Sequence, residues 1–262
     1  MEIIREAAVA GLFYPADPAE LDRQLDEFLA KAGDDHKPAL ALIVPHAGYV
    51  YSGPVAARAY THLFPLHDKV RKVALLGPAH RVGFHGIAMS SADYFVTPLG
   101  QIPLDHEARQ DLLRLPQVQQ LDQAHADEHC LEVQLPFLQK LLGDFSLIPL
   151  VVGDADAVEV AEVIEQLWRD EHTLVVISTD LSHYHDYLTA QQLDQNTCSA
   201  IESLEPDAIG YDQACGRNAL NGLLTVAKRR HLHVHTLDLR NSGDTAGPRD
   251  RVVGYGAWML TD

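Results

Sequence analysis

The stretch ALALIVPH (residues 39–46) is a run of small and branched apolar residues that stops at Pro45 and is followed at once by a histidine. A continuous apolar run of this length is typical of a β-strand that helices cover on both faces. Proline cannot donate a hydrogen bond to a neighbouring strand, so Pro45 favours the end of the strand. His46 therefore comes directly after the point where the predicted strand ends.

Five further segments have a strand-like pattern, and helical patterns lie between them. The other predicted strands are KVALLGPAH (72–80), FSLIPLVVG (145–153), TLVVISTD (173–180), HLHVHTLDL (231–239) and RVVGYGAWML (251–260). The predicted helices span residues 17–33, 53–64, 127–142, 156–170, 188–204 and 216–230. This alternation predicts a three-layer α/β/α fold with a mostly parallel or mixed central sheet, whose last strands form an antiparallel edge. No linker or repeat divides the chain, so we expect residues 1–262 to form a single domain.

The charge balance excludes some classes of partner. The 262 residues include 37 acidic and 20 basic ones, for a formal net charge of −17. A general nucleic-acid surface or an anionic-membrane surface needs a basic footprint, so we expect neither partner. No apolar run is long enough to span a membrane, and charged residues at 2, 5 and 6 interrupt any signal peptide, so we expect a cytoplasmic protein. The cysteines Cys130, Cys198 and Cys215 form no metal or redox pair by spacing.

Polar residues with useful chemistry follow four of the predicted strands. In open α/β sheets, ligands bind at the carboxyl ends of the strands. The residues that leave those strands are His46, His80, Asp180 with His183, and Asp244. Each of them alone is most simply a polar loop residue, but four such exits at one sheet edge indicate a site.

The residue types at these exits suit a metal. His46, His80 and Asp244 match the facial triad of two histidines and a carboxylate that holds non-haem Fe(II), although zinc or copper could use the same groups. His183 could act as a general base or as a hydrogen-bond donor close to the metal, since histidine is the side chain most often used for proton transfer.

Other polar groups have simpler interpretations beside a functional one. Glu128 and Glu132 lie four residues apart on one face of a predicted helix. They could be a pair of metal ligands, they could support the ligands by hydrogen bonds, or they could belong to a solvated helix face. His231, His233 and His235 alternate along a strand, where an exposed edge is favoured over a metal site. Cys215 precedes a helix, but no base matches it in the sequence, so a buried structural thiol is favoured. No phosphate-binding loop occurs.

Taken in order, these motifs resemble the Memo family, whose bacterial and archaeal members are described as protein B of the AmmeMemoRadiSam system. The matching segments are AGLFYPADPAEL, PHAGYVYSGPVAARAY, LLGPAHRVGFHGIAMSS, DEHCLEVQLPFL, STDLSHYHDY, CGRNALNGLL and the NSGD…VVGYGAW tail. They span nearly the whole chain. The family is in turn similar to the class III, LigB-type extradiol dioxygenases, which implies a mixed sheet flanked by helices and a metal cleft.

The resemblance also implies roles for individual residues. His46 and His80 match the two histidine ligands of the dioxygenases, and His183 falls where those enzymes place the catalytic histidine, with Asp180 beside it. Animal Memo proteins have a cysteine in the tail just before the final strand, and this sequence has none there. Asp244 is the nearest residue that could serve as the third ligand. A carboxylate ligand in place of the cysteine implies Fe(II) rather than thiolate–copper chemistry.

These observations lead to one functional expectation and two alternatives. We expect a cytoplasmic Fe(II)-dependent oxidoreductase of the dioxygenase type, in which O₂ and a small substrate, with phenols as the first class considered, bind beside the metal. His183 would move a proton and Asp180 would orient it. The alternatives are a non-catalytic protein that binds a peptide or metabolite in the same cleft, and a zinc-dependent hydrolase. A radical-SAM enzyme is the expected pathway partner.

Overall fold

The structure, a computed structural model, describes residues 2–33 and 36–262. Within these ranges, nine strands form one mixed sheet. Eight of them follow one another across the sheet in the order β10 (His183–His185), β12 (Val252–Thr261), β2 (Ala41–Val44), β9 (Thr173–Ser178), β3 (Lys72–Pro78), β8 (Ser146–Val152), β4 (Ile87–Met89) and β7 (Val118–Gln120). The ninth, β11 (His233–Asn241), pairs with β12.

The centre of the sheet is parallel, and antiparallel pairs flank it on both sides, since β4 is antiparallel to β8. Strand β9 runs parallel to both of its neighbours, β2 and β3, and β8 runs parallel to β3. Strand β12 is antiparallel to β2, and β11 is antiparallel to β12. All six predicted strands are therefore present, and the antiparallel pairing of the last two is confirmed.

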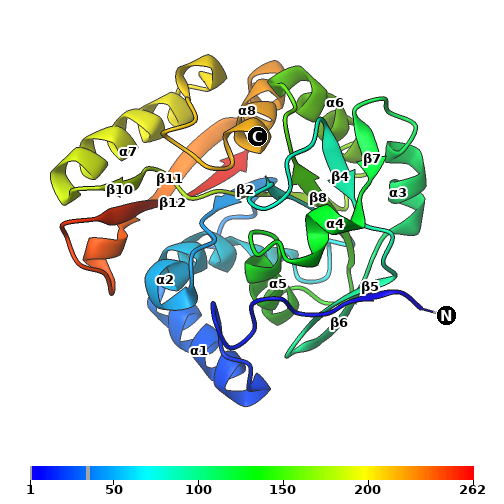
Figure 1. The fold of residues 1–262 in the computed structure, drawn as a ribbon, viewed down its shortest axis with the longest axis horizontal. Helices are drawn as coiled ribbons and strands as arrows, with labels where there is room; N and C mark the ends of the chain where they lie inside the picture. Colours follow the sequence, from blue (N-terminus) through cyan, green and yellow to red (C-terminus); the bar gives the residue numbers. More distant parts are fainter. Residues whose placement is uncertain (1, 34–35) are drawn as a thin grey trace.

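Helices cover both faces of the sheet (Figure 1). Against one face pack α1 (Pro18–Lys31), α2 (Tyr49–Tyr60), α4 (Asp122–Ala126) and α5 (Leu135–Leu141). Against the other face pack α3 (His106–Leu112), α6 (Ala157–Leu167), α7 (Tyr187–Glu202) and α8 (Arg217–Arg230). Side chains alternate between the two cores, because Leu42 and Val44 of β2 join the first and Ile43 joins the second. The predicted three-layer α/β fold is confirmed.

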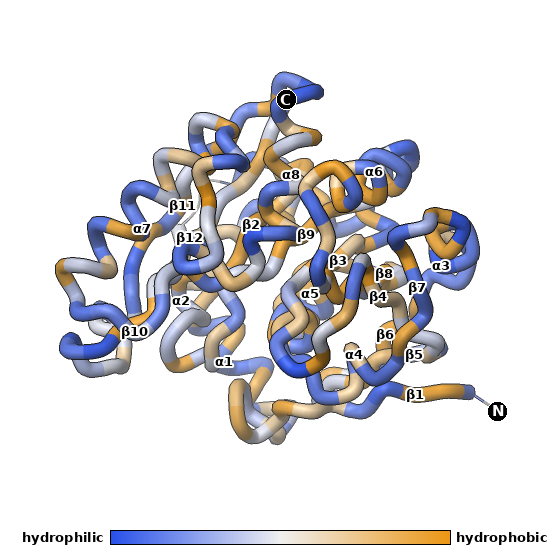
Figure 2. The backbone as a smooth tube through the Cα atoms, turned by 45° about the horizontal axis from the view of Figure 1, so that its top comes forward, coloured by the Kyte–Doolittle hydropathy of each residue, from blue (hydrophilic) through white to orange (hydrophobic). Residues whose placement is uncertain are grey.

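Helix α1 shows how local sequence produces these layers. The Asp17 side chain accepts a hydrogen bond from the Glu20 amide at 2.9 Å, which caps the helix as predicted. Leu21, Leu25 and Leu29 recur at helical spacing and are buried, and each contributes roughly 1.5–3 kcal/mol through burial. The same alternation of hydrophobic and hydrophilic positions is visible along α7 in Figure 2. Within the described ranges, no helix has the length and apolar character needed to cross a membrane.

A small second sheet lies beside the main one. It consists of β1 (Ile4–Arg5), β5 (Tyr94–Thr97) and β6 (Gly100–Pro103), with β1 parallel to β5 (Figure 1). These strands, like β4, β7 and β10, were not among the predicted ones. Segments of two to four residues are too short to show a periodic pattern.

The predicted helix over residues 127–142 is wrong in its first half. Residues 127–131 form a turn, a 3₁₀ turn follows at Glu132–Gln134, and α5 begins only at Leu135. Glu128 and Glu132 therefore do not share a helix face, and neither is solvated, because both are buried. Each carboxylate instead accepts hydrogen bonds from main-chain amides, which the irregular backbone brings within reach.

Glu132 anchors the N-terminal segment to the rest of the protein. Its carboxylate forms a buried ion pair with Arg5, and it accepts hydrogen bonds from the Ala8 amide at 2.8 Å and the Val9 amide at 3.0 Å. The Tyr14 hydroxyl donates to the same carboxylate at 2.6 Å. One side chain thus fixes residues 5–14.

We predict that Glu132→Gln lowers the free energy of unfolding by about 3–5 kcal/mol, because Arg5 is left buried without its counter-charge. Urea denaturation followed by circular dichroism measures this loss. Glu27→Gln, on the exposed side of α1, removes the same charge and should change stability by no more than about 0.5 kcal/mol. A loss below about 1 kcal/mol for Glu132→Gln would mean that this pair does not hold the N-terminal segment.

Candidate metal centre

Three neighbouring parallel strands end at the candidate site. His46 follows β2, Asp180 follows β9 and His80 follows β3, and β9 lies between the other two. The Thr179 amide donates to the Val44 carbonyl at 2.8 Å, which keeps the ends of β2 and β9 together. The His46 amide then donates to the Asp180 carboxylate, also at 2.8 Å. The predicted convergence of these three strand exits is therefore present in the structure.

The His46 imidazole is buried and oriented by Ser178. Its Nδ1 lies 2.9 Å from the Ser178 hydroxyl oxygen. That hydroxyl donates its own hydrogen to the Cys130 carbonyl at 2.7 Å, so it accepts from His46 and leaves Nδ1 protonated. Burial, and next the proximity of His80, holds the pKa of His46 well below its usual value. The ring is thus neutral, with the Nε2 lone pair free to bind a ligand.

The His80 imidazole has the same arrangement with a different acceptor. Its Nδ1 lies 2.9 Å from one Glu128 oxygen, and its main-chain amide donates to the other at 2.8 Å. Burial alone would raise the pKa of Glu128, but the hydrogen bonds and charge of His80 outweigh it and lower the pKa to about 2. An ionised Glu128 accepts the Nδ1 hydrogen, so Nε2 is the nitrogen with which His80, as a neutral ring, would bind a metal.

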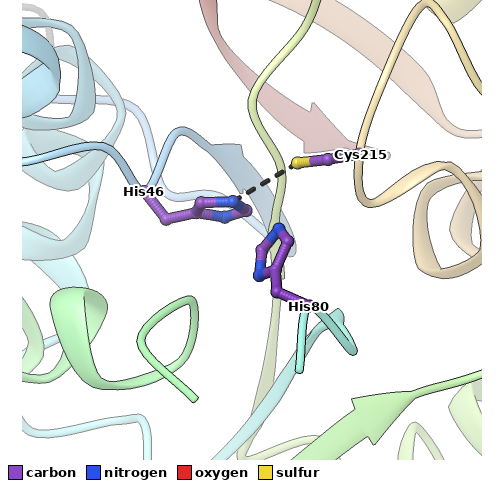
Figure 3. A group of neighbouring side chains, drawn as sticks. All are labelled: His46, His80 and Cys215. Atoms are coloured by element: carbon purple, nitrogen blue, oxygen red, sulfur yellow. Dashed lines mark hydrogen bonds between the residues drawn. The ribbon is translucent and has the colours of Figure 1, made fainter. Parts of the chain in front are cut away.

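Cys215 supplies a thiol to the two imidazoles (Figure 3). Its Sγ lies 3.3 Å from Nε2 of His46. The loop that carries it packs tightly on the end of β9, since the Gly216 amide donates to the Thr179 hydroxyl at 2.9 Å. A Cβ atom at Gly216 would lie 2.7 Å from the Ser178 carbonyl oxygen, so only glycine permits this approach. Burial and then the Asp180 charge raise the pKa of the Cys215 thiol to about 12.

His46, His80 and Cys215 could together hold a metal ion. Each offers one ligand atom, and these atoms all lie within 4.8 Å of one another. A tetrahedral ion with metal–nitrogen distances of about 2.0–2.1 Å and a metal–sulfur distance of about 2.3 Å spaces its ligands by roughly 3.4–3.6 Å. The separation of 3.3 Å between His46 and Cys215 is close to that spacing. The donor set therefore fits a transition metal with nitrogen and sulfur ligands.

A second group shares His80 and consists of His80, Glu128 and His129. The Glu128 carboxylate in this group already accepts hydrogen bonds from the main-chain amides of His80, His129 and Cys130. Its role as an acceptor that orients His80 is therefore better supported than a role as a metal ligand.

His183 and Asp180 border the same site. Nδ1 of His183 lies 2.8 Å from the Leu181 carbonyl, which can only accept, so Nδ1 carries the hydrogen and Nε2 is free. Asp180 is buried, and this burial raises its pKa. Its second carboxylate oxygen lies 3.9 Å from Nε2 of His46.

These side chains line a pocket of about 530 Å³, within the range for small-molecule sites. Its lining includes the polar side chains His46, His80, His129, Asp180 and His183. It also includes Phe13, Tyr51, Tyr184, Arg251 and Tyr255. The pocket therefore combines two of the three proposed ligands, His46 and His80, with a set of aromatic side chains, while Cys215 lies outside its lining.

Asp244 lies outside this pocket. Its carboxylate accepts a hydrogen bond from the Tyr187 hydroxyl at 2.5 Å and one from the Asn241 amide at 3.1 Å, and it lies 3.8 Å from the Arg249 guanidinium. Strand β11, which precedes it, is separated from β2 by β12, so the two strands are about 10 Å apart. The structure does not bring Asp244 to the histidines, and its role as a ligand stays a prediction that the geometry does not favour.

Two residues of the site were not among the predicted ones. We expected no thiol at the metal, and no base beside Cys215, but Cys215 lies against His46. The signal that could have found it is the glycine after it, which marks a close backbone approach. His129 stacks on His80 with ring centroids 4.7 Å apart, and burial, followed by the proximity of the His46 ring, lowers the pKa of His129 to about 4. The predicted helix over this segment concealed its position.

The remaining histidine prediction agrees with the structure for two of its three residues. His233 and His235 lie on β11, the edge strand, and both are exposed, as is His231 at the end of α8. The exposed-edge interpretation is confirmed for His233 and His235, whereas His231 is exposed at the end of α8 and does not lie on the strand.

Sequence comparisons with known proteins all indicate the same family. A sequence model described as "Memo-like protein" matches residues 5–259. A MEMO1 family protein of Aquifex aeolicus is 35% identical, over 96% of this chain and 97% of that protein. Another, of Sulfolobus acidocaldarius, is 34% identical, over 97% of this chain and 98% of that protein.

A solved structure shares the fold. The crystal structure of uncharacterized protein JW3007 from Escherichia coli K12 superposes with a TM-score of 0.54 at 13% identity, covering 82% of this chain and 98% of that one. At this identity the likeness concerns the fold alone. The sequence matches extend over nearly the whole chain, so the chain belongs to the family of Memo-like proteins.

Proposed function

We propose that this protein binds one iron(II) ion through His46, His80 and Cys215 and acts as an oxidoreductase of the dioxygenase type on a small phenolic substrate. The observation that carries the proposal is the shared orientation of the two imidazoles. Each commits Nδ1 to a protein acceptor, Ser178 or Glu128, and leaves Nε2 beside the same thiol. Such acceptors are the usual means by which a protein orients metal-binding histidines.

Three protein ligands would leave positions open on the ion, and two of these ligands, His46 and His80, line the pocket. Iron(II) bound there would supply activation of O₂, and the choice of iron rests on the resemblance to the extradiol dioxygenases, whose third ligand is a carboxylate. Here the Cys215 thiolate takes the place of that carboxylate, and two histidines with a thiolate suit copper and zinc as well, so the metal test includes both ions.

The residues of the chain have separate tasks in this proposal. The free Nε2 of His183 accepts a proton from the substrate, while its Nδ1 stays bonded to the Leu181 carbonyl. Asp180 holds the main chain at His46. The aromatic side chains of the pocket lining exclude water from the substrate. A cytoplasmic setting, which we include in the proposal, would keep the Cys215 thiol reduced.

We predict that Cys215, and not Asp244, is the third ligand. Protein purified without air, offered equal iron, copper and zinc and then desalted, should retain about one ion per chain by mass spectrometry. Cys215→Ser and His80→Gln should each weaken retention at least about tenfold, since even changes beyond the direct ligands cost about 10–100-fold. Asp244→Asn should retain the ion. If Asp244→Asn lost the metal and Cys215→Ser retained it, the prediction would be wrong and Asp244 would be the third ligand.

We predict that His183→Gln retains iron but lowers oxygen uptake about 10²–10⁴-fold, because it removes the proton acceptor. An oxygen electrode measures uptake by the iron-loaded protein with catechol and substituted catechols. His185→Gln is the matched control, since His185 lies two residues further on β10 and does not line the pocket. No uptake by the iron-loaded wild type with any compound would favour the alternative of a metal-binding protein without turnover.

A further inference from the structure

The pocket has one permanent positive charge in its lining. Among the described residues that line it, Arg251 is the only arginine or lysine. The chain as a whole carries a formal charge of −17, so acidic partners for an arginine are plentiful. Arg251 is exposed to solvent, and its place in the pocket lining puts its guanidinium where an anion that enters the pocket can meet it.

Arg251 has no acidic partner in the described part of the chain. Arg249, two residues earlier, lies 3.8 Å from Asp244 and 4.4 Å from the centre of the Tyr187 ring. Arg251 instead lies 4.5 Å from the centre of the Tyr184 ring. This contact holds the guanidinium in place by its face and leaves the N–H groups at its edge available to an anion.

Tyr184 holds this position in an unusual backbone conformation. Its φ is +64°, in the left-handed region that aromatic residues rarely adopt. The residues on either side, His183 and His185, pair with Val253 and Val252 of β12, with a bulge between them. The same short strand therefore orients the proposed base His183 and the ring that supports Arg251. Backbone strain of this kind is concentrated at functional sites.

We propose that Arg251 binds a carboxylate of the substrate, so that the pocket selects small aromatic acids over neutral aromatics. The aromatic side chains of the lining contact the ring of the substrate, and the pocket of about 530 Å³ accommodates a single ring with a short acidic substituent. This proposal rests on the proposed function, because it takes this pocket to be the substrate site. It adds the chemical class of the substrate and a residue that determines specificity.

Binding to the metal-free protein tests this proposal separately from metal loading and turnover. The probes are 4-hydroxybenzoate and 4-hydroxybenzamide, which have the same shape and differ in charge, and calorimetry or ligand-detected NMR measures their affinities. Wild type should bind the acid at least about tenfold more tightly, as expected for a hydrogen bond to a charged group. In Arg251→Gln this preference should disappear through weaker binding of the acid, while binding of the amide is unchanged. Arg251→Lys should retain part of the preference, because it keeps the charge but not the fork of N–H groups.

Arg81→Gln is the matched control, since Arg81 is exposed, follows His80 directly and does not line the pocket. It should leave the preference for the acid intact. The proposal is overturned if wild type binds acid and amide equally or does not bind the acid, or if Arg81→Gln reduces the preference as much as Arg251→Gln does. Failure of the proposed function would instead appear as absent metal or absent oxygen uptake, with the preference for the acid unaffected.

Discussion

The parallel register of β2, β9 and β3 is the constraint on which the site depends. Three parallel neighbours end at the same edge about 4.8 Å apart, so the residues that follow them share a small volume. The chain places His46, Asp180 and His80 at these three ends. Asp180, on the middle strand, bonds the main chain at His46, so the loops are tied to each other as well as to the sheet.

The second requirement is that the buried His46 ring, and the Nδ1 side of the more exposed His80 ring, find hydrogen-bond partners. A buried imidazole N–H without an acceptor costs about 1–3 kcal/mol. Ser178 and Glu128 accept from the two rings, and Gln134 donates to Ser178 at 2.8 Å while Ser178 donates to Cys130. This network provides hydrogen-bond acceptors for Nδ1 of each ring but not for Nε2. The free nitrogens on the other side are therefore a consequence of how the core is bonded, and they lie where the thiol approaches.

The long buried strands and the two histidines could be predicted from sequence because their signals are local. A continuous apolar run indicates a strand covered on both faces, and a polar residue after it lies at the sheet edge whatever the rest of the chain does. Cys215 and His129 could not be predicted in this way. Their positions depend on a loop that crosses the end of β9 and on a turn that replaces a predicted helix, and both follow from tertiary contacts. Asp244 also follows a strand, but the strand order puts it beyond β12.

The central claim is that two imidazole nitrogens and the Cys215 sulfur bind the same ion. X-ray absorption of the protein loaded with zinc, which does not change oxidation state, tests it most directly. The account predicts one sulfur at about 2.3 Å and two imidazole nitrogens at about 2.0–2.1 Å from the metal, with the sulfur absent in Cys215→Ser. A metal surrounded by nitrogen and oxygen ligands alone in the wild-type protein would contradict it.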